Sequence, residues 1–342
     1  MLVAPATLGL LAPLSATANE VTINDFNAAE EIAVTNSRVD GLEARLNNFE
    51  AGSFSETTSA SFGSTFYVGS VENSATGEAT TFSYDFGMDL STSFTGEDSL
   101  DIAVIGGNAS GTAVDDFMGG DGTSDALTLD GVSYTFPLGG ATVIVGDGVG
   151  VDDLNTGACA YSAFTDLLSD CGTSNVGGSA DSAFAIAYDF DNGFTLAGGA
   201  GGGTGTDGFF TEEDASTIGL EAAYTADTYG VSVAYTDDEA TTYWSVQAML
   251  APEGYPSLSV GYETDDDDAD AIFAGLTFAE VGPGSVSLGM ASTDLSSDDY
   301  YQYELAYSYP LNDGMTITPG VFIKETSGDD ETGVVVTTSF SF

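Results

Sequence analysis

The stretch from Tyr300 to Phe342 alternates with a period of two residues, and this alternation constrains the fold more than any other feature of the chain. In residues 301–309 the odd-numbered side chains are Tyr or Leu, whereas the even-numbered ones are polar or small. Because successive side chains of a β-strand point to opposite faces, this segment is predicted to be a strand with one apolar and one polar face. Residues 315–324 and 334–342 repeat the alternation, and the chain ends with an aromatic residue on the apolar face.

Two fold classes contain strands of this kind, a soluble β-sandwich and a transmembrane β-barrel. The apolar face is rich in Tyr and Phe near the strand ends, as in the aromatic girdles of membrane barrels. The strands are about ten residues long, which is enough to cross a bilayer when the strand is tilted. The pattern therefore favours an all-β fold, a transmembrane antiparallel β-barrel, over a sandwich.

The same alternation continues upstream to residue 58 and yields about sixteen candidate strands. Short connections, such as Asp191-Asn192-Gly193 and Asn312-Asp313-Gly314, alternate with longer acidic ones. Outer-membrane barrels have short periplasmic turns and longer outer loops, so an even strand number places both termini in the periplasm. The longest connection, residues 149–180, would be the third outer loop and is expected to fold inward as a constriction loop. The candidate strands are residues 58–71, 80–92, 98–107, 125–136, 140–148, 181–190, 194–202, 214–226, 228–237, 240–250, 255–264, 269–279, 284–293, 300–309, 314–324 and 332–342.

The charge of the chain excludes several classes of function. It has 54 acidic residues, three basic residues and no His, which gives a net charge of −51. Phosphates would be repelled, so nucleic acid is excluded as a partner. A Ser-His-Asp triad and a His-bound zinc ion are impossible without His. We therefore expect no enzyme activity, no metal centre and no other cofactor.

The two cysteines, Cys159 and Cys171, lie 12 residues apart within the predicted constriction loop. This spacing is too wide for a CxxC redox motif, and two thiolates alone make a poor zinc site. In an exported protein we expect them to form one disulfide that closes part of the loop. Two free thiols are the alternative.

The first 50 residues differ in pattern from the rest of the chain. Residues 1–18 have an apolar core and an Ala-Thr-Ala end, and they are predicted to be a secretory signal peptide rather than a buried apolar arm. Within residues 19–50, apolar side chains recur with 3-4-3 spacing from Val39 to Phe49, which predicts a short periplasmic coiled-coil helix. This segment either trimerises or serves as a linker. The barrel domain is then residues 51–342.

Several stretches of the chain resemble one family, the cyanobacterial outer-membrane porins related to the carbohydrate-selective porins. The stretches are VDGLEARLNNFEAGSFSETT, GFFTEEDASTIGLEAAYTADTYGVSVAYT, TITPGVFI and the terminal TTSFSF. The resemblance implies a homotrimer of barrels in outer-membrane lipid that admits small solutes and ions, and some members of the family are linked to inorganic iron uptake. Members usually carry an S-layer-homology domain between signal peptide and coil. Residues 20–28 leave no room for such a domain, so we do not expect peptidoglycan anchoring.

Carboxylates dominate the face of the strands that would line the lumen. Since the aromatic face would contact lipid, the opposite face lines the pore. A ring of carboxylates in a narrow aqueous pore favours cations and excludes anions. The predicted pore-lining residues are Asp85, Asp89, Asp101, Asp189, Glu221, Glu263, Glu304 and Lys324, and the predicted constriction residues are Asp152, Asp153, Asp166 and Asp170.

The sequence thus predicts a porin with a water-filled, cation-preferring channel for passive diffusion. The acidic run from Thr264 to Asp270 leaves an alternative open, a structural or adhesive barrel that binds divalent cations through acidic surface loops. That run lacks the Gly that an EF-hand loop requires at its sixth position. An outer-membrane hydrolase is a third possibility, which the lack of His disfavours.

Overall fold

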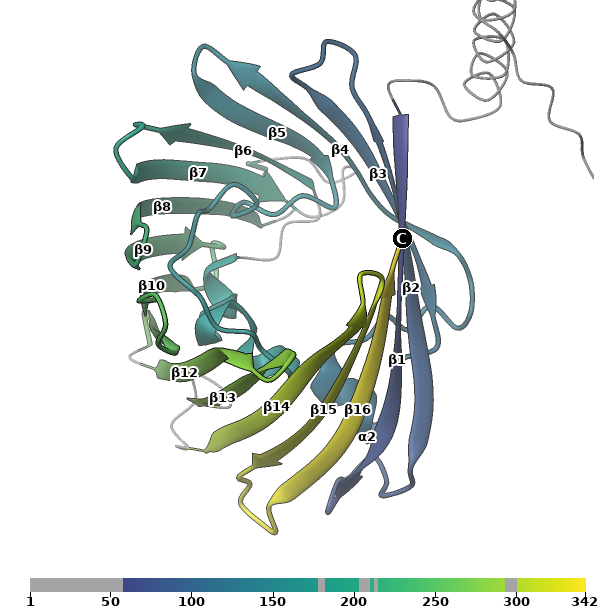
Figure 1. Ribbon diagram of the computed structural model, residues 1–342. Helices are drawn as coiled ribbons and strands as arrows, with labels where there is room; N and C mark the ends of the chain where they lie inside the picture. The colour runs from purple at the N-terminus through teal and green to yellow at the C-terminus, as the bar shows by residue number, and fades with distance from the viewer. Residues whose placement is uncertain (1–57, 178–181, 203–209, 212–214, 268, 293–299) are drawn as a thin grey trace, which may run out of the picture. The chain divides into compact units, whose positions relative to one another are not determined.

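The computed structural model describes residues 58–177, 182–202, 210–211, 215–267, 269–292 and 300–342, and these residues form a closed barrel of sixteen antiparallel strands (Figure 1). The ring closes because β1 pairs with β16 on one side and with β2 on the other. The predicted all-β, antiparallel barrel of sixteen strands is confirmed. The predicted signal peptide, residues 1–18, and the predicted coil, residues 19–50, lie outside the described residues.

All sixteen predicted strands are present, and their ends differ from the predicted ones by at most three residues. Their bounds are β1 (Thr58–Glu72), β2 (Thr81–Thr92), β3 (Ser99–Gly107), β4 (Thr128–Leu138), β5 (Ala141–Asp147), β6 (Ser182–Asp189), β7 (Phe194–Gly202), β8 (Ser216–Ala226), β9 (Tyr229–Asp237), β10 (Thr242–Leu250), β11 (Ser257–Asp265), β12 (Asp270–Val281), β13 (Gly284–Ser292), β14 (Tyr301–Asn312), β15 (Met315–Lys324) and β16 (Glu331–Ser341).

The alternation of the last strands corresponds to the two faces of the barrel wall. Leu305 and Val321 are 45% and 43% exposed on the outer face, whereas their neighbours Glu304 and Phe322 are 2% and 1% exposed on the inner face. Most large exposed apolar side chains of the strands lie on the same outer face as Leu305. An apolar outer face is what a strand needs when lipid surrounds the barrel.

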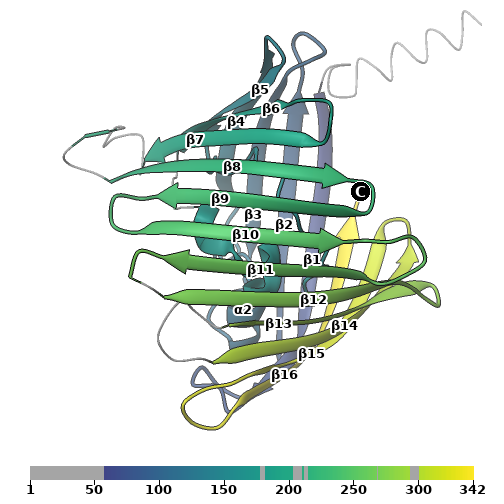
Figure 2. The same cartoon turned by 90° about the vertical axis from the view of Figure 1, so that its left-hand side faces the viewer.

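The connections differ in length at the two ends of the barrel (Figure 2). One end carries short turns, including residues 227–228 and 313–314. Phe342 lies at this end, because its backbone N–H donates to the carbonyl of Phe62 near the start of β1. The other end carries the long connections 73–80 and 108–127. The candidate strands 125–136 and 140–148 placed a turn at residues 137–139. In the structure β4 continues through Leu138, and the chain reverses at Gly139 and Gly140, both with positive φ, which suits Gly.

A short helix that the sequence pattern did not reveal, α2 (Ala113–Met118), lies in the second long connection. It has six residues, too few for a helical period to be visible, and its ends are capped by Thr112 and by Gly119 in the left-handed conformation. The helix packs against the inner face of the wall, where Phe117 lies 4.2 Å from Phe322 between ring centres. No helix in the described part of the chain is long and apolar enough to span a membrane.

Candidate functional site

Residues 148–177, the described part of the third long connection, run inside the barrel and are called the inner loop (Figure 1). Its outgoing limb, residues 149–165, contacts the wall from β7 and β8 at Val151 to β15 at Phe164. Its return limb contains two short 3-10 helices, η2 (Asp166–Gly172) and η3 (Ser174–Gly177). The predicted inward third loop is therefore present in the fold.

Glu304 on β14 anchors the turn between the two limbs. Its carboxylate accepts hydrogen bonds from the backbone N–H groups of Phe164 and Thr165, both at 2.8 Å, and from the Tyr161 hydroxyl at 2.7 Å. A loop lying against a wall cannot pair its N–H groups as a strand does, so it requires acceptors from the wall. Glu304 supplies them at a position that is 2% exposed.

Glu221 on β8 and Glu263 on β11 serve the same purpose for other parts of the loop. Glu221 accepts from the N–H groups of Thr156 at 2.6 Å and Gly157 at 2.8 Å. Glu263 accepts from the N–H of Val176 at 3.2 Å on the return limb. The sequence predicted all three glutamates to line an open lumen; they do point inward, but the inner loop covers them.

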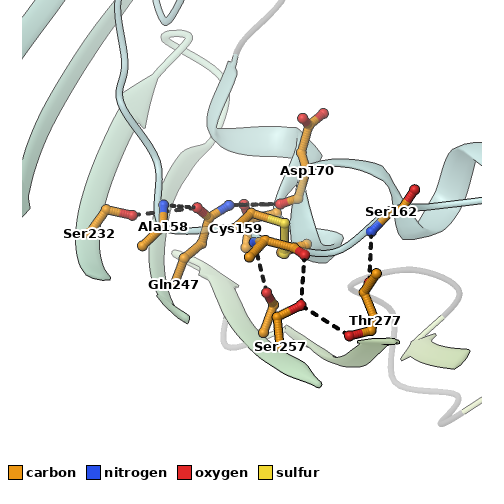
Figure 3. Close-up of a disulfide and its surroundings, with 12 residues drawn as sticks. Ala158, Cys159, Ser162, Asp170, Ser232, Gln247, Ser257 and Thr277 are labelled. Carbon is orange, nitrogen blue, oxygen red and sulfur yellow. Dashed lines mark hydrogen bonds between the residues drawn. A yellow bond between two sulfur atoms is a disulfide. The ribbon is translucent and has the colours of Figure 1, made fainter. Parts of the chain in front are cut away.

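The disulfide joins the two limbs of the inner loop (Figure 3). Cys159 lies on the outgoing limb and Cys171 on the return limb, so the predicted bridge is present. Beside it, Gln247 of β10 bridges the limbs a second time. Its side-chain oxygen accepts from Ala158 N–H at 2.9 Å and its amide nitrogen donates to the Asp170 carbonyl at 2.7 Å.

Glycines on the inner face of the wall make room for the inner loop. A Cβ atom on Gly261 would lie 2.0 Å from the carbonyl oxygen of Cys171, and one on Gly199 would lie 2.3 Å from that of Val151. Real Cβ atoms do not approach a backbone oxygen so closely. These strand glycines therefore permit backbone-to-wall contact that any other residue would prevent.

The remaining predicted wall residues point inward but have different surroundings. Asp85 accepts hydrogen bonds from the Tyr67 hydroxyl and from Thr65 N–H, and Asp189 accepts from the N–H of Asp191 in the turn after β6. Asp89 on β2 is exposed, and Asp101 on β3 is half-buried. In the register of the wall, Asp89 lies opposite Ala103 and Asp101 opposite Ser91, so the two carboxylates lie on the same face of adjacent strands.

Three of the four predicted constriction residues, Asp152, Asp166 and Asp170, line two cavities beside the inner loop. Asp152 is half-buried and lines a cavity of about 280 Å³ between the inner loop and strands β8 to β10. Burial raises the pKa of Asp152 and of Asp153. Asp166 and Asp170 are exposed on the return limb, and both line a second cavity of about 530 Å³. Asp170 borders both spaces.

The second cavity also contains Lys324, the single basic residue of residues 51–342. Two lining carboxylates were not predicted, Asp116 on α2 and Glu331 at the start of β16. Asp116 sits on a helix that the sequence did not reveal, so no sequence signal pointed to it. Glu331 pairs with Lys324 across β15 and β16, so both side chains lie on the same face of the wall. The alternation of side chains along these two strands was visible in the sequence.

Among the described residues, no three His, Cys, Asp or Glu side chains are grouped so that they could hold a metal ion. The described wall and inner loop instead offer accessible carboxylates, hydroxyls and one ammonium group.

Comparison with known proteins places the fold among the porins. No family model matches the chain. The structure of Pseudomonas putida OprB matches with a TM-score of 0.64 and 12% identity, over 84% of this chain and 94% of that one. A mutant of the Rh. blastica porin matches with a TM-score of 0.60 and 15% identity, over 83% of this chain and all of that one.

One curated relative has detectable sequence similarity, the uncharacterized protein alr4550 of Nostoc sp.. It is 31% identical over 159 residues, which cover 42% of this chain. The match spans only 27% of the relative, about a quarter of its length. The resemblance to cyanobacterial porins therefore stays a prediction, whereas the porin fold is established.

Proposed function

We propose that this protein is an outer-membrane channel for the passive diffusion of small solutes and inorganic ions, and that it prefers cations. One observation carries the proposal: a barrel with an apolar outer face holds an inner loop whose exposed side chains include the carboxylates Asp166 and Asp170. A wall of this kind suits lipid outside and water inside.

Cation preference follows from the excess of carboxylates over bases. Residues 51–342 contain Lys324 as their single base, so a solute crossing the barrel meets mainly negative charge. A carboxylate attracts a monovalent cation about 4 Å away by about 4 kcal/mol at the dielectric typical of a protein surface. Water in the pore and dissolved salt reduce this attraction, so the preference should weaken as ionic strength rises.

The reversal potential of purified protein in a planar bilayer tests the proposal. Under a KCl gradient at low salt, we expect potassium to permeate several-fold better than chloride. Changing Asp152, Asp153, Asp166 and Asp170 together to Asn should lower this preference. The matched control changes Asp265, Asp266 and Asp267 to Asn, since these side chains lie in and beside the outer turn after β11 and should matter less. A wild-type channel that prefers chloride would contradict the mechanism.

We further propose a homotrimer whose N-terminal segment lies in the periplasm, in the family of the cyanobacterial outer-membrane porins. The porin fold and the resemblance of residues 39–58, 316–323 and 337–342 support this assignment. An even number of strands supports it as well, because both ends of the barrel domain then lie at the end with short turns.

A further inference from the structure

The cavity of about 530 Å³ around Lys324, here called the mouth cavity, lies where three connections and the ends of three strands meet. Residues of the first two long connections, of η2 and of strands β14 to β16 line it. Its volume is in the range of roughly 300–1,000 Å³ that small-molecule sites occupy. Its charged and aromatic lining residues are Asp116, Phe117, Asp166, Asp170, Lys324 and Glu331.

Strand register fixes the position of Lys324. It pairs with Gln302 on β14 and with Glu331 on β16, so these three side chains lie side by side on the inner face. Gln302 is 1% exposed, which confirms that this face is the inner one. The Lys324 ammonium also lies 5.5 Å from the ring centre of Phe117, so α2 and β15 together hold it at the mouth.

The carboxylates approach the mouth cavity from several sides. Asp116 on α2 accepts a hydrogen bond from Thr76 at 3.0 Å. Asp166 lies beside the end of α2, because a Cβ atom on Gly119 would be 2.8 Å from its carboxylate. Asp170 uses its backbone carbonyl to bind Gln247, while its carboxylate points away from that network (Figure 3). The cavity thus combines one ammonium with four carboxylates.

We propose that the mouth cavity is a subsite for zwitterionic solutes with a second cationic group, that is, for basic amino acids. Lys324 is the only basic residue in the sequence of the barrel domain. It is therefore the only positively charged partner for an anionic group of a solute. A solute carboxylate therefore pairs with Lys324, and its cationic side chain turns toward Asp166 and Asp170. A simple anion is repelled by the surrounding carboxylates, and a neutral solute gains neither contact. The inference names a solute class for the proposed channel and rests on that proposal.

Calorimetric titration of the purified, full-length protein at low salt with L-lysine and with cadaverine tests this assignment. The two probes share a five-carbon chain with two amines and differ only in the carboxylate. We expect Lys324→Met to weaken L-lysine binding about fivefold, which is the size expected of a partly exposed ion pair. Cadaverine should bind at least as tightly as before, because the cavity becomes more negative. Lys324→Arg should retain most of the L-lysine affinity.

Equal changes for L-lysine and cadaverine in Lys324→Met would overturn the proposal, and so would a wild-type protein that binds no L-lysine. The result is independent of channel activity, because binding is measured in detergent without a membrane. KCl conductance of the same preparations in a planar bilayer tests the channel separately. Protein that binds L-lysine but carries no current would disprove the channel and leave the subsite in place.

Discussion

At the scale of single residues, Glu304 holds the inner loop through hydrogen bonds to Tyr161, Phe164 and Thr165. Glu304→Ala would leave the N–H groups of Phe164 and Thr165 buried without their acceptor. Each lost hydrogen bond to a charged group is worth about 1.5–3 kcal/mol. We expect amide exchange in residues 161–166 to accelerate by about tenfold or more, whereas the strands keep their protection.

A matched control for Glu304 is Asp89→Ala, which removes an inward carboxylate that is exposed. This variant should leave exchange of the inner loop unchanged. Exchange in Glu304→Ala as slow as in the wild type would show that the loop is held by other contacts, such as the Gln302 amide donating to Thr165 at 2.7 Å.

The protonation of Asp152 makes the charge of the inner loop depend on pH. Burial raises its pKa, so on acidification Asp152 loses its charge at a higher pH than an ordinary Asp with a pKa of about 3.9. A raised pKa also means that the loop is most stable with Asp152 protonated and loses that stability as pH rises through the folded-state pKa. We expect cation preference to begin falling before ordinary carboxylates titrate.

The reversal potential recorded at a series of pH values between neutrality and pH 4 checks this. Asp152→Asn should reduce the early part of the fall, to which Asp153 also contributes, and Asp266→Asn, in an outer turn, should not change it. A titration curve identical in wild type and Asp152→Asn would mean that Asp152 does not act on permeating ions.

At the scale of elements, the Cys159–Cys171 bridge keeps the two limbs of the inner loop together. Closing a loop of this length restricts the unfolded chain by about 3 kcal/mol. Replacing both cysteines by Ala should therefore loosen residues 156–172, seen as faster amide exchange there, and leave the barrel intact by circular dichroism. Wild-type protein, denatured without reductant, should show no thiol labelling. If amide exchange in the double variant is unchanged, the two limbs are held together by Gln247 and the wall glutamates instead of by the disulfide.

At the scale of the whole molecule, the outer face of β16, β1 and β2 carries a cluster of aromatic rings. Phe62 lies 5.7 Å from Phe342 between ring centres, and Phe66 lies 5.7 Å from Phe82. If the barrel wall holds the proposed trimer, deleting residues 19–50 should leave a trimer on native gels. A clean shift to monomer would assign assembly to the predicted coil instead.

The sequence by itself determined the strands, their faces and their number. Side-chain alternation is a local property, since each residue's direction depends only on its place in its own strand. It therefore predicted the inward side of Glu304 and Lys324 and the outward side of Leu305 without knowledge of any partner. Turn residues are a local signal as well, and they marked where strands end. The Cys159–Cys171 bridge could also be predicted, because the two cysteines are only 12 residues apart in one loop.

Only the tertiary structure decided which inward carboxylates face water. Glu304 and the loop residue Thr165 are 139 positions apart in sequence, and no periodicity relates them. Once the inner loop lies against β7 to β15, its unpaired N–H groups need acceptors, and the nearest wall carboxylates supply them. Glu221, Glu263 and Glu304 are thereby buried, whereas Asp89 on the uncovered wall is not. Packing against the wall also places α2 beside Lys324. A helix of six residues is too short to be stable by its own sequence, so it depends on the wall that it covers.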